Sequence, residues 1–449
     1  MTRRPRVALQ NLGCRVNRVE LDSIARDFER AGCELVAGER ADLVVVNTCA
    51  VTGEAEAKAR KAVRHAANLP ARPIVVATGC VASLFSDELA ALGEHVAVER
   101  DKRRVAERAL GLLAKRGLAG VEAATSSETV ACGHASQASG DSSPEAFAHA
   151  VTPTGRMRPG LKVQDGCDHR CTYCIVWKAR GPARSTSPDE VSRGLRALVA
   201  DGAREVVLTG IDLGRYEAAG LDLAGLLERL LKETQGVRLR LSSVEPAGVT
   251  DRLLQVMAAS EGRVAPFLHV PLQSGCDDTL RRMARPYTVE AYEAVAERAR
   301  AALPGLALAC DLIVGFPGET EAEFEESLES CRRIGFAKMH VFRYSKRPGT
   351  PAAVMGQQVS PEASAERSRL MRELAAASRR AYAESLVGTR QLVLVEREAM
   401  GVTGGLVDAL VDEGLRGRLV TVVPHALTSS GFLDARTREA GAPSSEAPR

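Results

Sequence analysis

The sequence predicts an α/β protein in which two units built on parallel sheets precede a small all-β module. Between residue 6 and about residue 116, and again from Leu161 to about Ser345, apolar runs without period-two alternation alternate with segments of helical spacing. Strands buried on both faces, joined by crossover helices, give this pattern. The end of the chain instead carries alternating apolar runs around a glycine-rich middle, which is typical of short antiparallel strands.

The N-terminal unit, residues 1–116, is expected to be an open parallel sheet with flanking helices. Apolar runs at 6–13, 43–47 and 73–78 predict its strands. The segments between them have helical spacing, with an apolar face over 21–28. Helices of this kind are the crossover connections that parallel neighbours require.

The central unit, residues 154–350, is expected to be a partial (βα)6 barrel. Six strand-like runs alternate there with mostly amphipathic segments. The runs lie at 161–164, 205–210, 238–243, 267–271, 306–315 and 338–344. A flexible linker is predicted before the barrel over 117–153, which is rich in Ala, Ser, Gly and Thr.

After the barrel the sequence predicts three further segments. These are a helical extension over 351–388, a small all-β module over 389–434 and a disordered tail over 435–449.

Size and composition limit the class of protein. At 449 residues the chain is too long for one ordinary core, and we expect about two to four domains. The 60 Lys and Arg nearly balance the 57 Asp and Glu, so any nucleic-acid surface must be a local patch. No run approaches the ~18 apolar residues of a membrane span and no cleavage signal is evident, so we expect a cytoplasmic protein. The eleven cysteines are then metal ligands or buried thiols rather than disulfides.

One short loop carries Cys167, Cys171 and Cys174 directly after the first barrel strand. Three thiolates leave one iron of a cubane 4Fe-4S cluster open, whereas a structural zinc site fills all four positions. Zinc with His169 as fourth ligand is the alternative, but the loop would strain to turn His169 onto the same ion, and we expect it to be solvated. With Tyr173 before the last cysteine, the loop resembles the cluster loop of the radical S-adenosylmethionine enzymes.

Cys14, Cys49 and Cys80 each follow one of the three predicted N-terminal strands. The C-terminal ends of parallel strands share one edge of a sheet, so topology brings these cysteines together. Three separate core cysteines are the plainer alternative. We favour a second three-thiolate 4Fe-4S cluster with its own open iron. Cys132 in the linker is expected to be unliganded, and the sequence assigns no role to Cys33, Cys276, Cys310 or Cys331.

Polar residues and glycines at the other barrel strand ends are expected to face the same mouth. In the radical S-adenosylmethionine superfamily, S-adenosylmethionine chelates the open iron and is cleaved there to a deoxyadenosyl radical. The resemblance therefore implies cofactor contacts from Tyr173, Gly210, Glu245 and Gln273. Turns and helix caps are the alternative interpretation of these strand ends.

The two triads together with His269–Gly275 and Gly315–Thr320 resemble, in this order, the methylthiotransferase family of radical S-adenosylmethionine enzymes. The stretches Gly13–Asn17, Asn47–Lys58 and Ser242–Pro246 are similar to the branch that modifies threonylcarbamoyladenosine next to the anticodon of transfer RNA. The resemblance implies that a methylthio group replaces the carbon 2 hydrogen of the adenine. Two S-adenosylmethionine molecules are consumed, one for the methyl group and one for the radical. The loop cluster would generate the radical, and the N-terminal cluster would hold the sulfur.

The implied partners are the anticodon stem-loop of transfer RNA and an electron donor of unknown identity, with the enzyme acting as a monomer. Arg180, Arg184 and the basic segment 58–64 are candidates for phosphate contacts, although a solvated charged face is the plainer interpretation. In the family the C-terminal module, called TRAM, binds transfer RNA, and 389–434 resembles it loosely. Trp177 stands where a proline is usual, close enough to the loop to stack on the substrate base or to plug the mouth.

Two other functions are compatible with parts of this pattern. One is a radical enzyme that acts on another transfer RNA adenosine or on a ribosomal protein side chain. The other is a non-catalytic RNA-binding protein with structural metal sites. Both triads lack a fourth protein ligand, which favours an enzyme.

Overall fold

The computed structural model describes residues 3–118, 152 and 155–437. The predicted linker over 117–153 and the predicted tail over 435–449 therefore lie largely outside the described residues, and Cys132 lies outside them as well. Within the described residues the fold is the mixed α/β arrangement that the sequence predicts.

The N-terminal sheet has five parallel strands in the order β2-β1-β3-β4-β5. The sequence predicts only the three central strands, because β2 and β5 are two and three residues long and show no pattern. The strands are β1 (Arg6–Leu12), β2 (Glu34–Leu35), β3 (Leu43–Thr48), β4 (Ile74–Gly79) and β5 (Val96–Val98).

Helices cover both faces of this sheet. The helices are α1 (Arg15–Arg30), α2 (Gly53–Ala67), α3 (Cys80–Leu84), α4 (Ser86–Ala90) and α5 (Val105–Lys115). Along β3, Leu43 and Val45 belong to the apolar core shared with α1 and α5, whereas Val44 and Val46 belong to the core shared with α2. Burial on both faces explains the unbroken apolar run of β3.

The central unit consists of six parallel strands. Two three-stranded sheets, β12-β9-β6 and β13-β14-β15, are joined by parallel bridges from Leu239 to Val264 and from Ser243 to His269. The strands are β6 (Gly160–Lys162), β9 (Glu205–Thr209), β12 (Arg238–Leu241), β13 (Phe267–His269), β14 (Ala307–Val314) and β15 (Lys338–Arg343). The predicted partial barrel is thus confirmed, with β6 and β15 at its open edges.

Helices and short strands fill the connections of the barrel. The helices are α6 (Val176–Arg180), α7 (Pro188–Ala200), α8 (Leu223–Glu233), α9 (Asp251–Ala259), α10 (Asp277–Arg282), α11 (Val289–Ala302) and α12 (Glu321–Ile334). The short strands β7 (Gln164–Asp165) and β8 (Arg184–Ser185) pair antiparallel on either side of the loop that bears Cys167. A second short pair, β10 (Glu217–Ala218) and β11 (Leu221–Asp222), lies after β9.

The predicted helical extension contains α13 (Pro361–Ser385), which leads into a six-stranded sheet of order β19-β16-β17-β18-β21-β20. The strands are β16 (Gln391–Arg397), β17 (Met400–Thr403), β18 (Asp408–Leu410), β19 (Leu419–Val422), β20 (Ala426–Leu427) and β21 (Leu433–Asp434). Arg238 and Arg240 tie this module to the N-terminal end of β12 by donating to the carbonyls of Leu392 and Gly404.

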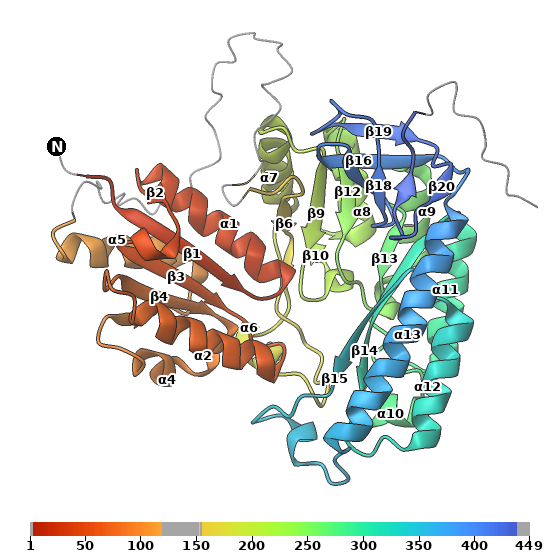
Figure 1. Cartoon of the computed structure of the whole chain (residues 1–449), viewed down its shortest axis with the longest axis horizontal. Helices are drawn as coiled ribbons and strands as arrows, with labels where there is room; N and C mark the ends of the chain where they lie inside the picture. The colour runs from red at the N-terminus through yellow and green to blue at the C-terminus, as the bar shows by residue number, and fades with distance from the viewer. Residues whose placement is uncertain (1–2, 119–151, 153–154, 438–449) are drawn as a thin grey trace, which may run out of the picture.

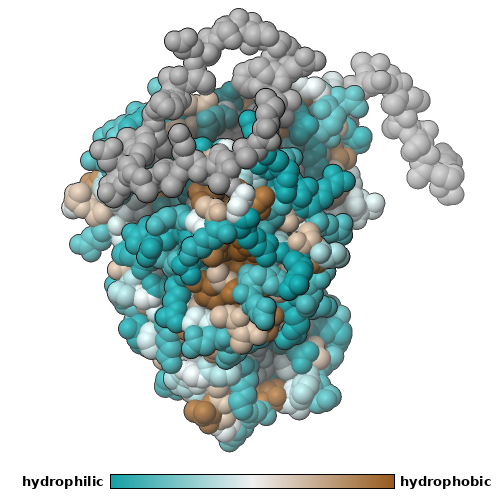
Figure 2. All heavy atoms as spheres, turned by 90° about the vertical axis from the view of Figure 1, so that its left-hand side faces the viewer, coloured by the Kyte–Doolittle hydropathy of each residue, from teal (hydrophilic) through white to brown (hydrophobic). Residues whose placement is uncertain are grey.

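Figure 1 shows the N-terminal sheet (red to orange) beside the open side of the barrel, with the C-terminal module (blue) at one end. The side of the molecule seen in Figure 2 is largely hydrophilic, with a small group of hydrophobic residues near its centre. No helix in the described ranges is long and apolar enough to cross a bilayer.

Candidate active site

The loop from Cys167 to Cys174 is held by backbone contacts to distant parts of the barrel. The amide of Cys167 donates to the carbonyl of Gly181 at 3.1 Å, and Thr172 donates from its amide to Met283 at 3.1 Å. The side chain of Thr172 also binds the carbonyl of Arg282 at 2.9 Å. These contacts fix the loop on the C-terminal side of the barrel strands, with its three thiols close to one another.

A buried arginine contacts the middle cysteine of this loop. Nη1 of Arg285 donates to Sγ of Cys171 at 3.1 Å, and Nη2 binds the carboxylate of Glu245. Nε of Arg285 donates to the hydroxyl of Tyr287 at 3.0 Å. The guanidinium therefore connects a cysteine of the loop to one of the residues predicted to bind the cofactor.

The outer cysteines of the loop are weakly acidic. Burial raises the pKa of Cys167 to about 12 and that of Cys174 to about 11. Thiols bind iron as thiolates, so both must lose a proton when a cluster binds.

The N-terminal cysteines are brought together by side chains that join their three strand ends. Nδ2 of Asn17 donates to the carbonyl of Thr48 at 2.8 Å, next to Cys49. The hydroxyl of Thr48 in turn donates to the carbonyl of Thr78 at 2.6 Å and accepts from the amide of Ala82 at 3.2 Å. Thr78 and Ala82 flank the Gly79–Cys80 step, so one chain of hydrogen bonds links the segments that carry Cys14, Cys49 and Cys80.

Two glycines allow these segments to approach closely. A Cβ on Gly13 would lie 2.7 Å from Cβ of Cys49, which is closer than real side chains come. A Cβ on Gly79 would lie 2.2 Å from the carbonyl oxygen of Thr48, and Gly79 has a φ of +96°. Each glycine directly precedes a cysteine, so the backbone at both positions is shaped for close packing of the triad.

The thiols of this triad influence one another. A hydrogen bond from the Cys49 thiol lowers the pKa of Cys14 to about 6, and the anion that forms raises the pKa of Cys49. Cys14 is thus ionised at neutral pH, in the form that binds iron.

Arg180 lies between the two triads. Its Nη2 donates to Oδ1 of Asn17 at 2.5 Å, and the sulfur of Cys14 lies 3.7 Å from the same oxygen. Its Nη1 donates to Glu20 at 3.0 Å and to Asp165 at 2.9 Å, two residues before Cys167. The N-terminal sheet and the cluster loop therefore share one buried hydrogen-bond network.

The charges in this network are balanced by lysines from both units. Burial would raise the pKa of Glu20, but Lys102, Arg180 and Lys162 outweigh it and lower that pKa to about 2. Lys162 also bonds Asp165 at 3.1 Å. Glu20 is consequently a fixed anion at the boundary between the units.

Two family models match the chain. The model of the radical SAM superfamily matches residues 161–331, and that of the uncharacterized protein family UPF0004 matches residues 6–99. A relative from Treponema pallidum (strain Nichols), named threonylcarbamoyladenosine tRNA methylthiotransferase MtaB, is 35% identical over 88% of this chain and 92% of its own. The chain belongs to the methylthiotransferase family of radical S-adenosylmethionine enzymes. It is of the MtaB type, a name that further relatives 32 to 37% identical also carry.

Other members of the methylthiotransferase family carry a different name. One from Erythrobacter litoralis (strain HTCC2594), named tRNA-2-methylthio-N(6)-dimethylallyladenosine synthase, is 34% identical over 87% of this chain and 86% of its own. Among solved structures, a radical S-adenosylmethionine methyltransferase, TsrM from Kitasatospora setae, aligns with a TM-score of 0.55 and 15% identity over 78% of this chain and 77% of that one. This likeness supports the fold.

The donor sets of this methylthiotransferase fit cubane clusters better than zinc. Tetrahedral zinc brings sulfur ligands to about 3.8 Å from one another. In the described structure neither triad has its three sulfurs within 4.8 Å of one another. A cubane binds each thiolate on a different iron, so its ligands are spaced more widely. Three thiols at each site leave the fourth position to a non-protein ligand.

The structure corrects two expectations near the loop. His169 is not solvated, because its Nε2 lies 3.2 Å from the carboxylate of Asp212 and its side chain is only 21% exposed. Arg180 was a candidate for phosphate contacts, but its side chain is 5% exposed and its Nη1 and Nη2 donate to Glu20, Asp165 and Asn17 inside the protein. Arg184 keeps an exposed side chain while donating to Asp165 at 2.8 Å.

The other residues with predicted cofactor contacts lie around the loop. Tyr173 packs edge-on against Phe316, with ring centroids 6.5 Å apart. At Gly210, a Cβ would lie 2.8 Å from Oε1 of Gln164, which accepts from the amides that follow Gly210. Gln273 has a φ of +68° and its backbone pairs with β14. Their contacts with a cofactor remain predictions.

Trp177 and the basic segment 58–64 are the other candidates for contact with the RNA substrate. The ring of Trp177 is covered by the guanidinium of Arg170, 4.2 Å from its centroid. On α2, Lys58 and Arg60 pair with Glu54 and Glu56 one turn earlier. These basic residues are thus partly neutralised, and their contact with RNA remains a prediction.

The remaining described cysteines are buried. Burial raises the pKa of each of these thiols, which keeps them protonated and unreactive. They are Cys33, Cys276, Cys310 and Cys331.

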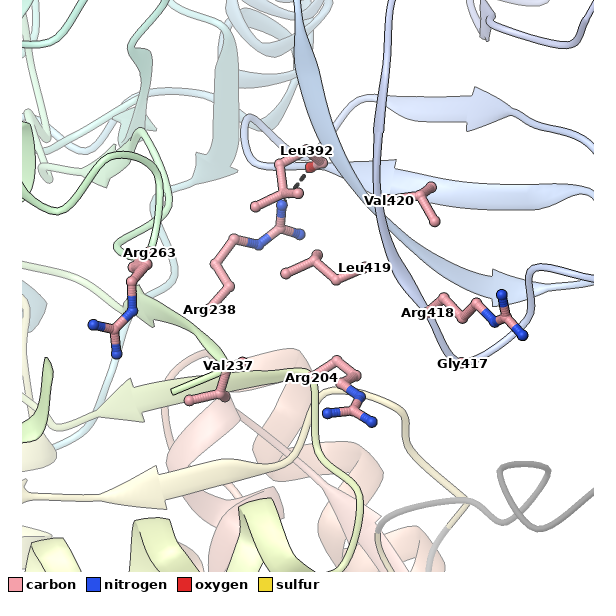
Figure 3. Close-up of a pocket in the computed structure, with 10 residues that line it drawn as sticks. Arg204, Val237, Arg238, Arg263, Leu392, Gly417, Arg418, Leu419 and Val420 are labelled. Carbon is pink, nitrogen blue, oxygen red and sulfur yellow. Dashed lines mark hydrogen bonds between the residues drawn. The ribbon is translucent and has the colours of Figure 1, made fainter. Parts of the chain in front are cut away.

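A separate cavity of about 660 Å³ lies between the N-terminal ends of barrel strands and the C-terminal module, at the end of the barrel opposite the cysteines. Figure 3 shows Arg204, Arg263 and Arg418 around it, with Arg238 pointing toward Leu392. Arg238 is held by Glu205, and Arg263 donates to the carbonyl of Leu231. The cavity therefore belongs to the junction of barrel and module and not to the cysteine sites.

Proposed function

We propose that this methylthiotransferase replaces the carbon 2 hydrogen of threonylcarbamoyladenosine at position 37 of transfer RNA with a methylthio group. The observation that carries the proposal is the pairing of two three-thiol sites through Asn17 and Arg180. One such site is enough for radical generation, and a second one next to it is what sulfur insertion requires. The similarity to relatives named for this nucleoside supports the choice of substrate.

In the proposal Cys167, Cys171 and Cys174 hold one 4Fe-4S cluster, and Cys14, Cys49 and Cys80 hold the other. With S-adenosylmethionine bound, the loop cluster supplies the one-electron chemistry that removes a hydrogen atom from an unreactive carbon. The cluster on the N-terminal triad would hold the sulfur to be inserted on its open iron. We infer that the two tasks belong to different domains. Residues 1–116 would hold the sulfur, and residues 154–350 would generate the radical.

The chain itself contributes positioning and charge. Arg285 donates to Cys171 and to Glu245, and Glu245 lies on the side of the barrel mouth where the cofactor would bind. Gly210 and Gln273 present backbone at neighbouring strand ends, and Tyr173 closes the loop against Phe316. The network around Arg180 keeps the N-terminal triad in a fixed place relative to the loop.

Nucleoside analysis tests the choice of substrate. A strain that lacks this gene should lose 2-methylthio-threonylcarbamoyladenosine from its transfer RNA and accumulate the precursor without the methylthio group. The wild-type gene should restore the product, and Cys49→Ala should not. Loss of the dimethylallyladenosine product instead would assign the chain to the activity for which the Erythrobacter litoralis relative is named.

The division of labour between the triads is tested by iron content and cofactor cleavage. Anaerobically reconstituted chain should hold about eight irons, that is, two cubanes. Cys49→Ala should remove about half of them and leave reductive cleavage of S-adenosylmethionine intact, whereas Cys171→Ala should abolish the cleavage. Loss of cleavage in Cys49→Ala would show that the assignment of tasks is wrong.

The same proposal gives the C-terminal module, 389–434, a part in binding the anticodon stem-loop, with the enzyme working as a monomer in the cytoplasm. Electrons come from a donor whose identity the site does not specify. Size-exclusion chromatography with light scattering checks that the enzyme is a monomer. Measuring how a chain without 389–434 binds transfer RNA checks the role of the C-terminal module.

A further inference from the structure

Three side chains inside the barrel form a cluster that the proposed reaction does not use. His269, Asp311 and His340 each place one ligand atom within 4.8 Å of the others. Nε2 of His269 and Nδ1 of His340 both lie 3.1 Å from Oδ1 of Asp311, and the two rings meet edge to face with centroids 5.4 Å apart. Elsewhere in the described part of the chain, no group of three such residues is as tight.

The register of three neighbouring strands brings these residues together. Asp311 on β14 is directly opposite His340 on β15. His269, the last residue of β13, is opposite Ala309, which shares a face of β14 with Asp311 because strand side chains alternate. The neighbouring residues Cys310 and Leu312 belong to the main apolar core of the barrel, so the cluster is on the opposite face of the strand.

In this cluster one carboxylate oxygen faces two imidazole nitrogens. Nδ1 of His340 is hydrogen-bonded to Oδ1 of Asp311 at 3.1 Å. Nε2 of His269 lies 3.1 Å from the same oxygen, and His269 is only 9% exposed. Hydrogen bonds between histidine and aspartate are the ordinary explanation of such a cluster, and a metal ion bound to all three atoms is the other arrangement that brings them this close.

We propose that His269, Asp311 and His340 form a mononuclear site for a divalent transition-metal ion such as Zn²⁺. Two imidazoles and one carboxylate are a common ligand set for such ions. With metal–ligand distances of about 2.0 to 2.1 Å, ligand atoms lie about 2.8 to 3.4 Å apart for angles between 90° and tetrahedral. The observed 3.1 Å separations fit this range.

Three protein ligands leave further coordination positions for water or an oxygen donor. The side chains of His340 and Asp311 are 39% and 26% exposed, so these positions are accessible. The loop after β15 also reaches the N-terminal unit, where Arg347 donates to the carbonyl of Ala50 and to Glu56. The strand that carries His340 is therefore followed by a loop that contacts the N-terminal unit next to Cys49.

Zinc content per chain tests the proposal in protein that carries both clusters. Cluster-loaded wild type, Asp311→Asn, His340→Gln and a His65→Gln control are dialysed against buffered Zn²⁺, and zinc and iron are measured in the same samples. His65 is a suitable control because it is an exposed residue of α2. At equal iron content, wild type and the control should hold one more zinc than the two ligand variants, or bind it at least about tenfold more tightly.

The coordination of that zinc gives a second measurement that does not depend on the variants. X-ray absorption at the zinc edge should show nitrogen and oxygen at about 2.0 to 2.1 Å, with imidazole scattering. Sulfur at about 2.3 Å would show that the zinc sits on cysteines and would overturn the proposal. Equal zinc content together with equal zinc affinity in wild type and Asp311→Asn would overturn it as well. Neither result bears on the methylthio product, so the proposed function is tested separately.

Discussion

Arg285 and Cys171 lie in direct contact, with Nη1 of the arginine donating to the sulfur at 3.1 Å. The arginine side chain is 2% exposed and also binds Glu245. Hydrogen bonds and positive charge at a ligand sulfur favour the reduced, more negative state of an iron–sulfur cluster and so raise its reduction potential. Arg285 thus connects a sulfur that would bind the cluster to Glu245, which is predicted to contact S-adenosylmethionine.

Replacing Arg285 with Gln should lower the reduction potential of the loop cluster, because the N–H bond and the charge are both lost. A redox titration followed by electron paramagnetic resonance measures the potential. Arg285→Lys, which keeps the charge, should shift it less. Arg281→Gln is the control, since that exposed side chain pairs with Asp278. An unchanged potential in Arg285→Gln would mean that this contact does not tune the cluster.

Arg180→Met should destabilise the chain by about 1 to 3 kcal/mol, because Glu20 and Asp165 each lose one buried hydrogen-bonding partner, while Lys102, Lys162 and Arg184 remain beside them. The midpoint of urea unfolding measures this loss. The salt dependence of transfer RNA binding should stay the same, since the guanidinium is not at the surface. Arg184→Gln, whose side chain is 58% exposed, should instead lower the slope of log K against log salt by about 0.9 if Arg184 contacts a phosphate. A reduced slope in Arg180→Met would contradict the buried assignment.

The strands and cysteines that organise the fold were predictable because they depend on short-range patterns and one topological rule. The apolar run of β3 shows burial on both faces, and a parallel sheet must bring its C-terminal strand ends to one edge. Cys49 could therefore be assigned to a triad without knowledge of its contacts. The chain of hydrogen bonds through Asn17 and Thr48 gives that assignment its physical basis.

Contacts between distant segments were not predictable from pattern. Arg180 and Arg285 are both basic residues near the site, and charge alone does not tell whether solvent or a carboxylate surrounds a guanidinium. His340 gives no local signal, because only the register of β14 and β15 brings it to Asp311.

Gly13→Ala should empty the N-terminal site while leaving the loop site intact. The added Cβ would lie 2.7 Å from Cβ of Cys49 and 2.8 Å from Nδ2 of Asn17, so one of these side chains must move. The variant should lose about half of its iron and form no methylthio product, yet still cleave S-adenosylmethionine. Iron analysis and product assays measure this.

Gly111→Ala is the matched control for Gly13→Ala. Gly111 lies in α5 and a Cβ there would meet nothing within 4 Å, so alanine should be neutral or stabilising. Full iron content in Gly13→Ala would show that the close approach to Cys49 is not needed for cluster binding.

Iron uptake by the loop triad should depend more steeply on pH than uptake by the N-terminal triad. The pKa of Cys167, about 12, and that of Cys174, about 11, lie above neutral pH, so both thiols must release a proton when iron binds. Cys14, with a pKa of about 6, is already ionised at neutral pH, whereas its partner Cys49 has a raised pKa. Each thiol that must lose its proton makes the affinity for iron rise about tenfold per pH unit. Because Cys167 and Cys174 are compared with Cys49 alone, the iron affinity of the loop triad should rise about tenfold more per pH unit than that of the N-terminal triad. Reconstitution with limiting iron between about pH 6.5 and about pH 8.5 compares Cys49→Ala, which keeps the loop triad, with Cys171→Ala, which keeps the other. Equal or reversed slopes would show that these thiols titrate differently from the arrangement described.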